Sequence, residues 1–309
     1  MKRIKLTLLS CFAAITATTA LAADLGPLIT PVDLIETTEQ PIVLDIRGEG
    51  FDAGHIEGAV SAPYSLFRGP ADNPGKVSAV EQLEILFEKL GLDPMRPIVI
   101  VSQGSTDTDF GASARVYWTL KSSGFTELSV LNGGATAWVN AGFPLTTQTL
   151  LPTPTDIEVM WSETWTADTA AVERFVAGEG RSKLIDARPT TFFEGKNAHN
   201  AAARPGTLPG AQSLPYTEFF RSGATAISND MDVSELKATL GIEVGDAVVS
   251  FCNTGHWAAT NWFAMSELAG LENVKLYPGS MVEYSQTDGE MQNQPGFISN
   301  FINQITGGN

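Results

Sequence analysis

Cysteine and histidine are scarce in this sequence of 309 residues, which contains two of the first and three of the second. Cys11 lies in an N-terminal run that is predicted to be removed, so the mature chain keeps Cys252 alone. One thiol cannot form an internal disulfide, which excludes a disulfide-stapled fold and a thioredoxin-type dithiol. A metal site is disfavoured too, because Cys252 and His256 have only His55 and His199 as further imidazoles. We expect no bound metal.

Basic residues are also few. Lys and Arg number 19 against 35 Asp and Glu, giving a net charge of −16. Nucleic-acid binding requires basic patches that neutralise phosphates, so a nucleic-acid partner is not expected. No segment after residue 22 approaches the roughly 18 to 20 consecutive apolar residues of a membrane-spanning helix. We therefore expect a chain without a membrane span.

Residues 1–22 have the pattern of an export signal. Three basic residues lie among the first five positions, an apolar run covers 6–21, and Ala20-Leu21-Ala22 is the small-residue pattern that precedes a cleavage point near Ala23. Residues 8–11 also resemble a lipoprotein processing site, but cleavage there would leave an apolar run on the mature chain. The sequence predicts an exported, periplasmic protein.

The length of the mature chain favours two domains, and an internal repeat supports this. Each half contains an apolar strand ending in Asp-x-Arg, a Gly-rich turn, a second strand, a helix-like segment and a closing Gly motif. The matched blocks are 43–47 with 184–188, 54–64 with 206–216, 98–101 with 247–251, 112–122 with 258–268, and 131–134 with 276–279. We predict domains at 23–150 and 151–309, with the seam near the prolines at 152 and 154.

Each half alternates short apolar runs with helix-length segments, for example 98–101, 112–122 and 128–131. This alternation predicts an α/β fold in which each domain is a parallel sheet with helices on both faces. Ligands of such sheets bind where the strands end and the following loops enter helices. Cys252 directly follows the predicted strand 247–251, so we expect it to lie in such a site.

The segment after this strand must turn the chain into a helix that begins near Ala258. Gly255 permits the positive φ or close backbone approach that a tight loop needs. The loop amides and the helix N-terminus are expected to point toward the sulfur and to stabilise it as a thiolate, which is the nucleophilic form. A tyrosine phosphatase would need an arginine six residues after Cys252, where Ala258 stands, so phosphatase activity is disfavoured.

Beyond these patterns, the chain resembles the tandem-domain rhodanese family of sulfurtransferases. The motifs that carry the resemblance are Leu44-Asp45-Ile46-Arg47, Gly54-His55-Ile56-Glu57-Gly58-Ala59, Leu131-Asn132-Gly133-Gly134-Ala135-Thr136-Ala137-Trp138, Gly142-Phe143-Pro144, Asp186-Ala187-Arg188, Arg204-Pro205-Gly206-Thr207-Leu208-Pro209-Gly210-Ala211 and Tyr277-Pro278-Gly279-Ser280. They are spread over nearly all of the mature chain. In the family, residues equivalent to 252–257 form a six-residue active loop suited to a persulfide.

The resemblance implies a two-step reaction without a cofactor. Cys252 would take sulfur from a small donor such as thiosulfate or 3-mercaptopyruvate, and a thiophilic acceptor such as cyanide or a thiol would remove it. An alternative is a non-catalytic module that carries sulfur or binds a partner, and an exported sulfur-carrier protein would then be the partner.

Substrate contacts are assigned to the rest of the loop and to two arginines: Asn253, Thr254, Gly255, His256, Trp257, Ala258, Arg188 and Arg204. Thr254 can donate a hydrogen bond, and His256 either supplies partial positive charge or merely covers the cleft with Trp257. Arg188 either binds the donor or pairs with Asp186. Donor binding is less expected here, because Phe192 or Phe193 replaces a second arginine that the family usually has. Arg204 either reaches the cleft or braces its own loop.

The first half is expected to be catalytically silent. Its segment 102–111 aligns with the cysteine loop, is longer, and contains no cysteine, histidine or lysine. Asp45, Arg47 and His55 are therefore interpreted as structural. We expect this half to pack against the second and to form one wall of the cleft.

Overall fold

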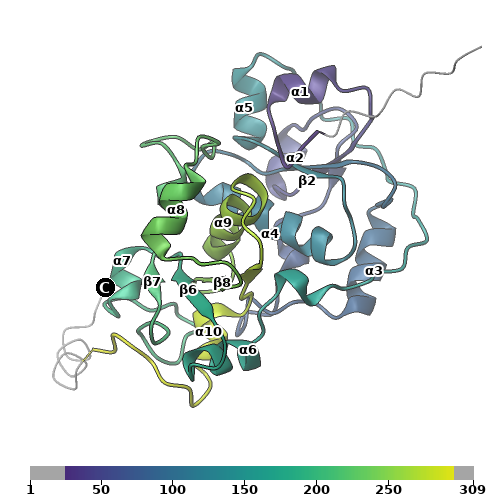
Figure 1. The fold of residues 1–309 in the computed structure, drawn as a ribbon. Helices are drawn as coiled ribbons and strands as arrows, with labels where there is room; N and C mark the ends of the chain where they lie inside the picture. Colours follow the sequence, from purple (N-terminus) through teal and green to yellow (C-terminus); the bar gives the residue numbers. More distant parts are fainter. Residues whose placement is uncertain (1–24, 296–309) are drawn as a thin grey trace, which may run out of the picture.

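Two parallel β-sheets, one from each half of the sequence, organise the computed structural model, which describes residues 25–295 (Figure 1). The first sheet has the order β1-β5-β4-β2-β3 and the second β7-β6-β8-β9. The strands are β1 (Leu28–Ile29), β2 (Ile42–Asp45), β3 (Val60–Ser61), β4 (Ile98–Val101), β5 (Leu128–Leu131), β6 (Ser182–Asp186), β7 (Gln212–Ser213), β8 (Ala247–Phe251) and β9 (Val274–Leu276). The predicted strands 98–101, 128–131 and 247–251 are confirmed as β4, β5 and β8. The predicted signal segment 1–22, including Cys11, lies outside the described residues.

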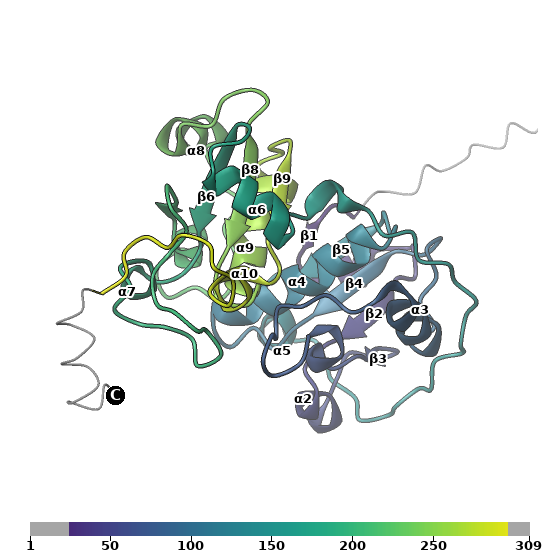
Figure 2. The ribbon, with the colours of Figure 1, turned by 90° about the horizontal axis from the view of Figure 1, so that it is seen from below.

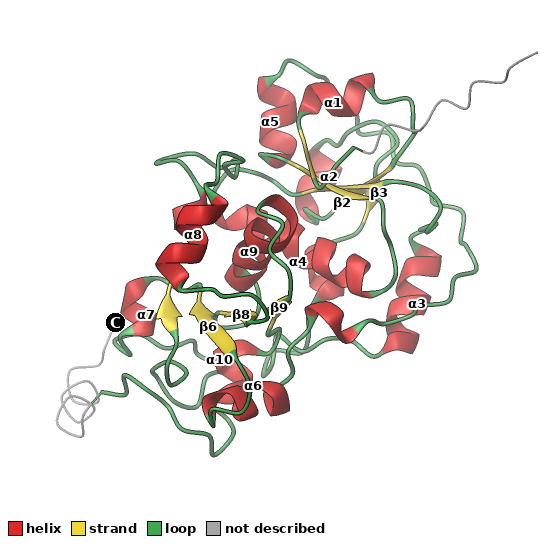
Figure 3. Cartoon of the chain, in the orientation of Figure 1, coloured by secondary structure: helices red, strands yellow, loops and turns green. Residues whose placement is uncertain are grey.

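The helices connect successive strands (Figure 3). They are α1 (Pro31–Glu36), α2 (Glu49–Ala53), α3 (Val80–Lys89), α4 (Thr108–Ser122), α5 (Gly134–Asn140), α6 (Thr169–Val176), α7 (Thr190–Phe193), α8 (Val233–Leu240), α9 (Trp257–Phe263) and α10 (Ser280–Tyr284). Three short 3₁₀ segments are η1 (Tyr64–Phe67), η2 (Glu163–Trp165) and η3 (Tyr216–Phe219), and a π-helical turn, η4 (Ala264–Leu268), continues α9. Within residues 25–295, no helix combines the length and the apolar character that a membrane crossing requires.

Alternation along the strands places apolar side chains on both faces of each sheet, because successive residues point to opposite sides. In β4, Ile98 and Ile100 pack with residues of α3 and α4, whereas Val99 and Val101 pack with residues of α1, α2 and α5. In the second sheet, α8 and α9 cover one face, and α6 and α10 cover the other. The predicted fold class, a parallel sheet with helices on both faces in each domain, is confirmed.

The two domains share one apolar core through α4 and α9, which lie side by side in both views (Figure 2). The ring of Phe263 meets Phe110 and Tyr117 edge-on, with centroids 5.3 and 5.0 Å apart. Edge-to-face pairs of this kind add about 0.5–1.5 kcal/mol each to apolar burial. The helix that follows the cysteine loop is therefore held by its counterpart from the other half. The predicted boundary at residue 150 lies between the sheets and stays a prediction.

The repeat is visible in equivalent backbone hydrogen bonds, and these correct one detail of the sequence alignment. The carbonyl of Ser102 accepts from Ala135 N at 2.9 Å, as the carbonyl of Cys252 accepts from Met281 N at 3.0 Å. Ser102 is thus the counterpart of Cys252, and Gly134 is the counterpart of Ser280, one residue further along than the alignment of 131–134 with 276–279 implies.

The loop after β4 is also shorter than predicted, because α4 begins at Thr108 rather than at residue 112. The carboxylate of Asp109 accepts the amides of Ser105 and Thr106 at 2.7 and 3.1 Å and so holds the chain at the start of this helix. The first turn of α4 ends in Gly111, and glycine is a poor helix former, so this turn was not predicted.

Candidate active site

Cys252 lies directly after the central strand β8, at the carboxyl end of the second sheet, as predicted. Its thiol is free, and the residue is only 1% exposed. The loop runs from Cys252 to His256 before α9 begins, and Gly255 has φ +68°, the left-handed conformation that the tight turn was expected to need. The strand end and the glycine together fix the position of the sulfur.

Ser280, at the start of α10, holds this loop through hydrogen bonds of its hydroxyl group. Its Oγ accepts hydrogen bonds from the amides of Cys252 and Gly255 at 3.0 and 3.1 Å, and it donates to the carbonyl of Tyr277 at 2.7 Å. Ser280 has φ +51°, a conformation that costs a non-glycine residue about 1–2 kcal/mol. Since its counterpart Gly134 has a similar φ of +57° without a side chain, the serine hydroxyl is the feature specific to the cysteine loop.

Several loop amides remain free to bind an anion. Among residues 25–295, the amides of Asn253, Thr254 and His256 have no hydrogen-bond acceptor. Two loop amides are instead directed to Ser280, as described above. Free N–H groups gathered in one turn form a site for negative charge, which is what a thiolate or a persulfide carries.

A cavity of about 230 Å³ opens beside the sulfur. Its lining residues come from both domains: Arg68, Thr108, His199, Cys252, Asn253, Thr254, His256 and Trp257. The loop residues Asn253, Thr254, His256 and Trp257 thus lie where the sequence placed them. The first domain supplies Arg68 and Thr108, in agreement with its predicted role as one wall of the cleft.

His256 connects the cysteine loop to the first domain through both ring nitrogens. Nε2 lies 2.9 Å from the carbonyl oxygen of Thr108, so this nitrogen carries the proton and donates it. Nδ1 then accepts from the hydroxyl of Tyr64 at 3.0 Å. The hydrogen bonds assign a neutral tautomer that bridges the two domains.

The environment of His256 opposes protonation. Burial, and next the nearby positive charge of Arg68, lower the pKa of His256 to about 4. Of the two alternatives for His256, the lowered pKa argues against partial positive charge near neutral pH and leaves the ring as a neutral part of the cleft wall. Desolvation at the domain junction, which the sequence does not show, is the physical reason.

Stability should depend on pH through His256. The unfolded chain protonates this ring near its ordinary pKa of 6.5, whereas the folded protein keeps it neutral down to about pH 4. The unfolded state therefore binds more protons between these values, and the free energy of unfolding should fall by about 2 kcal/mol from pH 7 to pH 5. Urea unfolding at several pH values measures this loss.

The control for that experiment is His256→Gln, because the amide can still donate to Thr108 but does not titrate. Its unfolding free energy should be lower than that of the wild type at pH 7 and should change less between pH 7 and pH 5. Parallel pH curves for the two proteins would show that His256 is not the titrating group.

Trp257 forms an aromatic wall of the cavity. Its ring stacks on Tyr216, with centroids 5.3 Å apart and planes within 5°, and meets Phe192 edge-on at 6.1 Å. Its indole Nε1 donates to Thr108 Oγ1 at 2.8 Å. The side chain is fixed on several sides and so gives the cavity a rigid boundary.

Arg188 does not reach the cavity. Its guanidinium binds the carboxylate of Asp186 in a fork, at 2.9 Å from Nε and 2.6 Å from Nη2, and also donates to the carbonyl of Gly206. In the first domain, Arg47 forms the same fork with Asp45 and reaches a glycine carbonyl in the same way. An identical arrangement in a half without the cysteine indicates a structural role, which resolves the alternative in favour of pairing.

Arg204 and Ala258 are likewise used away from the cavity. The guanidinium of Arg204 donates to the carbonyls of Ser285 and Thr287 at 3.0 and 2.7 Å, so it joins its loop to the segment after α10. Ala258 is fully buried, and its carbonyl accepts from Ser250 Oγ at 2.9 Å. The structure does not bring either residue to the cavity as a substrate ligand.

The positive charge of the site comes instead from the first domain. Arg68 Nη2 donates to the carbonyl of Thr254 at 2.9 Å, and Arg115 Nη1 donates to that of Gly255 at 3.4 Å. Burial, and next the charge of Arg68, lower the pKa of Arg115 to about 9, so it remains protonated at neutral pH. Neither guanidinium forms an ion pair with a carboxylate in residues 25–295. Two unneutralised cations beside the loop favour an anionic sulfur.

Sequence reasoning did not assign six residues of the site: Tyr64, Arg68, Thr108, Arg115, His199 and Ser280. Two of them had a signal in the repeat. Thr108 belongs to the segment 102–111 that aligns with the cysteine loop, and Tyr64 closes the repeated block 54–64. Ser280 was hidden because Gly134 was aligned with Gly279. No motif singled out the remaining three residues, because contacts between remote segments place them.

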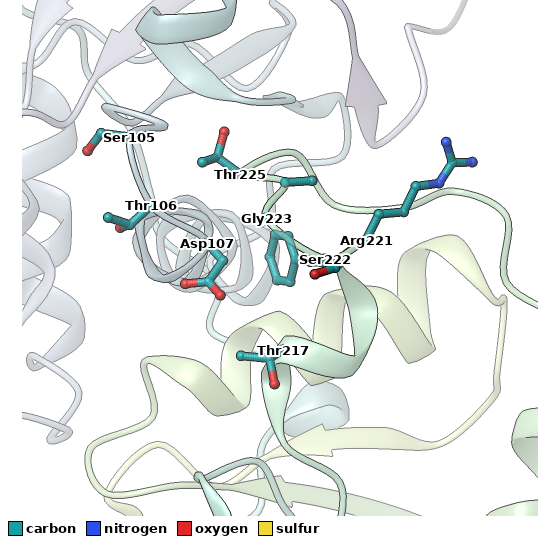
Figure 4. A pocket seen from close by; sticks show the side chains of 10 residues that line it. Ser105, Thr106, Asp107, Thr217, Arg221, Ser222, Gly223 and Thr225 are labelled. Atoms are coloured by element: carbon teal, nitrogen blue, oxygen red, sulfur yellow. The ribbon is translucent and has the colours of Figure 1, made fainter.

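A second hollow, of about 290 Å³, lies between the start of α4 and the loop 220–225 (Figure 4). Asp107 and hydroxyl side chains such as those of Ser105 and Thr217 line it, and the side chain of Arg221 extends away from Asp107. Tyr216 lies between the second hollow and the cysteine cavity. Its hydroxyl donates to Asp107 at 3.2 Å, and its ring stacks on Trp257. No cysteine, histidine or lysine lines this second hollow. The described part of the chain also contains no cluster of three or more His, Cys, Asp or Glu that could hold a metal.

Comparison with known families gives an independent view of this geometry. The rhodanese-like domain matches the chain twice, over residues 30–141 and 170–287. The chain belongs to the rhodanese-like domain family. The two matched segments contain the two sheets apart from the edge strand β1, so the tandem arrangement inferred from the repeat is confirmed.

Curated relatives cover most of the chain at modest identity. A protein of Synechococcus elongatus named "Putative thiosulfate sulfurtransferase" is 27% identical over 264 residues, 82% of this chain and 80% of that protein. The "Sulfur carrier protein TtuD" of Thermus thermophilus is 27% identical over 249 residues, 77% of this chain and 85% of that protein. Both names belong to the relatives and are not assigned to this chain.

Solved structures show the same fold. SseA from Escherichia coli, described as a 3-mercaptopyruvate sulfotransferase, superposes with a TM-score of 0.70 at 21% identity, covering 82% of this chain and 98% of SseA. The anaerobic ergothioneine biosynthesis enzyme of Chlorobium limicola gives a TM-score of 0.74 at 18% identity, covering 89% of this chain and 72% of that enzyme. At these identities the likeness concerns the rhodanese fold alone.

Proposed function

We propose that this rhodanese-like protein is a sulfurtransferase that moves a sulfane sulfur from a small donor to a thiophilic acceptor through a persulfide on Cys252. The observation that carries the proposal is the position of Cys252: a solitary buried thiol at a strand end, beside a cavity, among free amides and unneutralised guanidiniums. The relatives named as thiosulfate sulfurtransferases support the same reaction class.

The reaction has two displacement steps. In the first, the Cys252 thiolate attacks the outer sulfur of the donor; a new S–S bond forms, the donor bond breaks, and its electron pair leaves with sulfite from thiosulfate or with the pyruvate enolate from 3-mercaptopyruvate. In the second, cyanide or a thiolate attacks the outer sulfur of the persulfide, and the electron pair returns to Cys252. The displacements transfer sulfur without an external oxidant or cofactor.

The loop residues have defined parts in these steps. The amides of Asn253, Thr254 and His256 stabilise the anionic sulfur, and Ser280 keeps the turn in the required conformation. Trp257 excludes water on one side, since its ring is held by Tyr216 and Thr108. Preorganised donors of this kind are effective because they do not have to reorganise during the reaction.

Mass spectrometry of the intact protein tests the persulfide directly. Treatment with thiosulfate or 3-mercaptopyruvate should raise the mass by one sulfur atom on Cys252, and cyanide should remove it as thiocyanate. Assays with the two donors side by side identify the better one. Failure of both donors to form the adduct or to support turnover would reject the proposal.

A sulfur carrier is the second candidate function, and the name of the Thermus thermophilus relative favours it. A carrier would form the same persulfide but would pass its sulfur to a protein partner and would turn over small acceptors poorly. Steady-state rates with cyanide distinguish the two: an efficient enzyme repeats the cycle, whereas a carrier stops after one equivalent.

We also propose, from residues 1–22, that the protein acts in the periplasm; a mature N-terminus near Ala23 in exported protein is the test.

A further inference from the structure

Arg68 is placed in the active site by the domain that has no cysteine. It follows the 3₁₀ segment η1 and lines the cavity that Cys252 also lines. Its Nη2 is fixed on the carbonyl of Thr254 at 2.9 Å, and its guanidinium lies over the ring of Tyr64, 5.3 Å from the centroid. Both contacts hold the side chain toward the loop.

The other end of this guanidinium is unused. Arg68 Nη1 is buried and has no hydrogen-bond partner among residues 25–295. No carboxylate lines the cavity. A buried donor group of a cation without an acceptor is costly, and an anion bound in the cavity would satisfy it.

No other side chain in the lining supplies a positive charge. Burial lowers the pKa of His256 to about 4, and burial, then Arg68, also lower that of His199, so both rings are mainly neutral at pH 7. In the second domain, Arg188 is paired with Asp186 and Arg204 is bound to backbone carbonyls. Arg115, the other cation beside the loop, does not line the cavity, so Arg68 is the cation that faces a bound donor.

We propose that Arg68 binds the anionic group of the sulfur donor, whether the sulfonate-like end of thiosulfate or the carboxylate of 3-mercaptopyruvate, while the donor's outer sulfur faces Cys252. This inference rests on the proposed sulfurtransferase function. It makes the site a composite of both domains, in which the first domain selects an anionic donor and the second performs the chemistry. The shared ligand chemistry is a small anion whose charge adjoins a transferable sulfur.

The test compares Arg68→Gln with the wild type, using thiosulfate, 3-mercaptopyruvate and the uncharged carboxamide of 3-mercaptopyruvate as donors. For the two anionic donors KM should rise about 10- to 100-fold with a smaller change in kcat, because a charge-assisted contact to the donor is lost. For the carboxamide, KM should change by less than about threefold, since it has no charge to lose. Arg68→Lys keeps the charge, and its KM for the anionic donors should lie between those of the wild type and of Arg68→Gln. If KM rises for only one of the two anionic donors, that donor is the one whose anionic group Arg68 binds.

Arg221→Gln is the matched control. It removes the same charge from an exposed side chain whose partner is Asp230, and its KM values should stay within about twofold of wild type, because exposed pairs contribute little. An unchanged KM in Arg68→Gln, or an equal fall in kcat with charged and uncharged donors, would overturn the inference, since the latter indicates that Arg68 only braces Thr254.

The outcomes separate this inference from the proposed function. Absence of wild-type turnover and of the persulfide rejects the function itself, whereas active wild type with an insensitive Arg68→Gln rejects the inference alone. If circular dichroism shows that Arg68→Gln does not fold, kinetic measurements on the wild-type protein test the inference instead. A preference for 3-mercaptopyruvate over its carboxamide that weakens with added salt supports an anion site, and equal kcat/KM values for the two donors overturn it.

Discussion

Cys252→Ser is expected to lower sulfur transfer from thiosulfate to cyanide by about three orders of magnitude or more, because a serine hydroxyl is neither ionised nor able to form a persulfide. The fold should persist, since the backbone bonds from Cys252 to Ser280 and Met281 do not involve the sulfur. Steady-state thiocyanate formation measures the loss. The mass adduct should disappear together with the activity, which ties the two observations to one atom.

The repeat offers a matched control for this substitution. Ser102 directly follows the equivalent strand β4 of the first domain, is buried, and accepts the equivalent backbone hydrogen bond from Ala135 in α5. Ser102→Ala should leave kcat and KM within about twofold of the wild type, since single changes away from the chemistry have small effects. Transfer above background in Cys252→Ser, or comparable losses in both variants, would contradict a covalent mechanism confined to the second domain.

Gly255→Ala is expected to have the second largest effect, on both stability and activity. Gly255 has φ +68°, and a Cβ at this position would lie 2.5 Å from the carbonyl oxygen of Pro278 and still closer to the guanidinium of Arg115. Removing the clash requires the loop to shift away from Ser280 and the first domain. We expect a loss of about 2–4 kcal/mol in unfolding free energy and at least about a 100-fold loss in kcat.

Gly178→Ala separates the clash from the backbone conformation. Gly178 has a similar φ of +79°, but no atom lies within 4 Å of its added Cβ. This variant should lose only about 1 kcal/mol, the cost of a left-handed alanine, and should keep its activity. Urea denaturation and kcat measurements compare the two. If Gly255→Ala were as stable and as active as Gly178→Ala, the tight packing around the loop would not matter for function.

Much of the fold could be predicted from the sequence because its signals are local. Apolar runs set the strands β4, β5 and β8 at the predicted bounds, since buried strands need continuous apolar residues. The start of α4 was missed because its first turn contains a single large apolar residue, Phe110, followed by Gly111, and glycine is a poor helix former. Local pattern therefore predicts buried strands better than the first turns of helices.

The site could be predicted only in part. Cys252 and its loop were located because a strand end, a glycine and a solitary thiol occur together in the sequence. Arg188 was a candidate cation, but the structure shows it paired with Asp186, and the matching fork at Arg47 indicates that this pair has a structural role. Arg68 had no signal at all, because it precedes Cys252 by 184 positions in the chain and contacts Thr254 only through domain packing.

The sequence by itself thus determined the tandem α/β architecture, the family motifs and the choice of Cys252 as the proposed nucleophile, because these depend on local patterns and on a residue type that occurs once after residue 22. Tertiary structure alone decided the charge of the site. Packing of α4 against α9 buries His256 and keeps it neutral, and it delivers Arg68 and Arg115 to the loop from the other domain. Charge states and distances between remote segments depend on desolvation and packing, which no local pattern specifies.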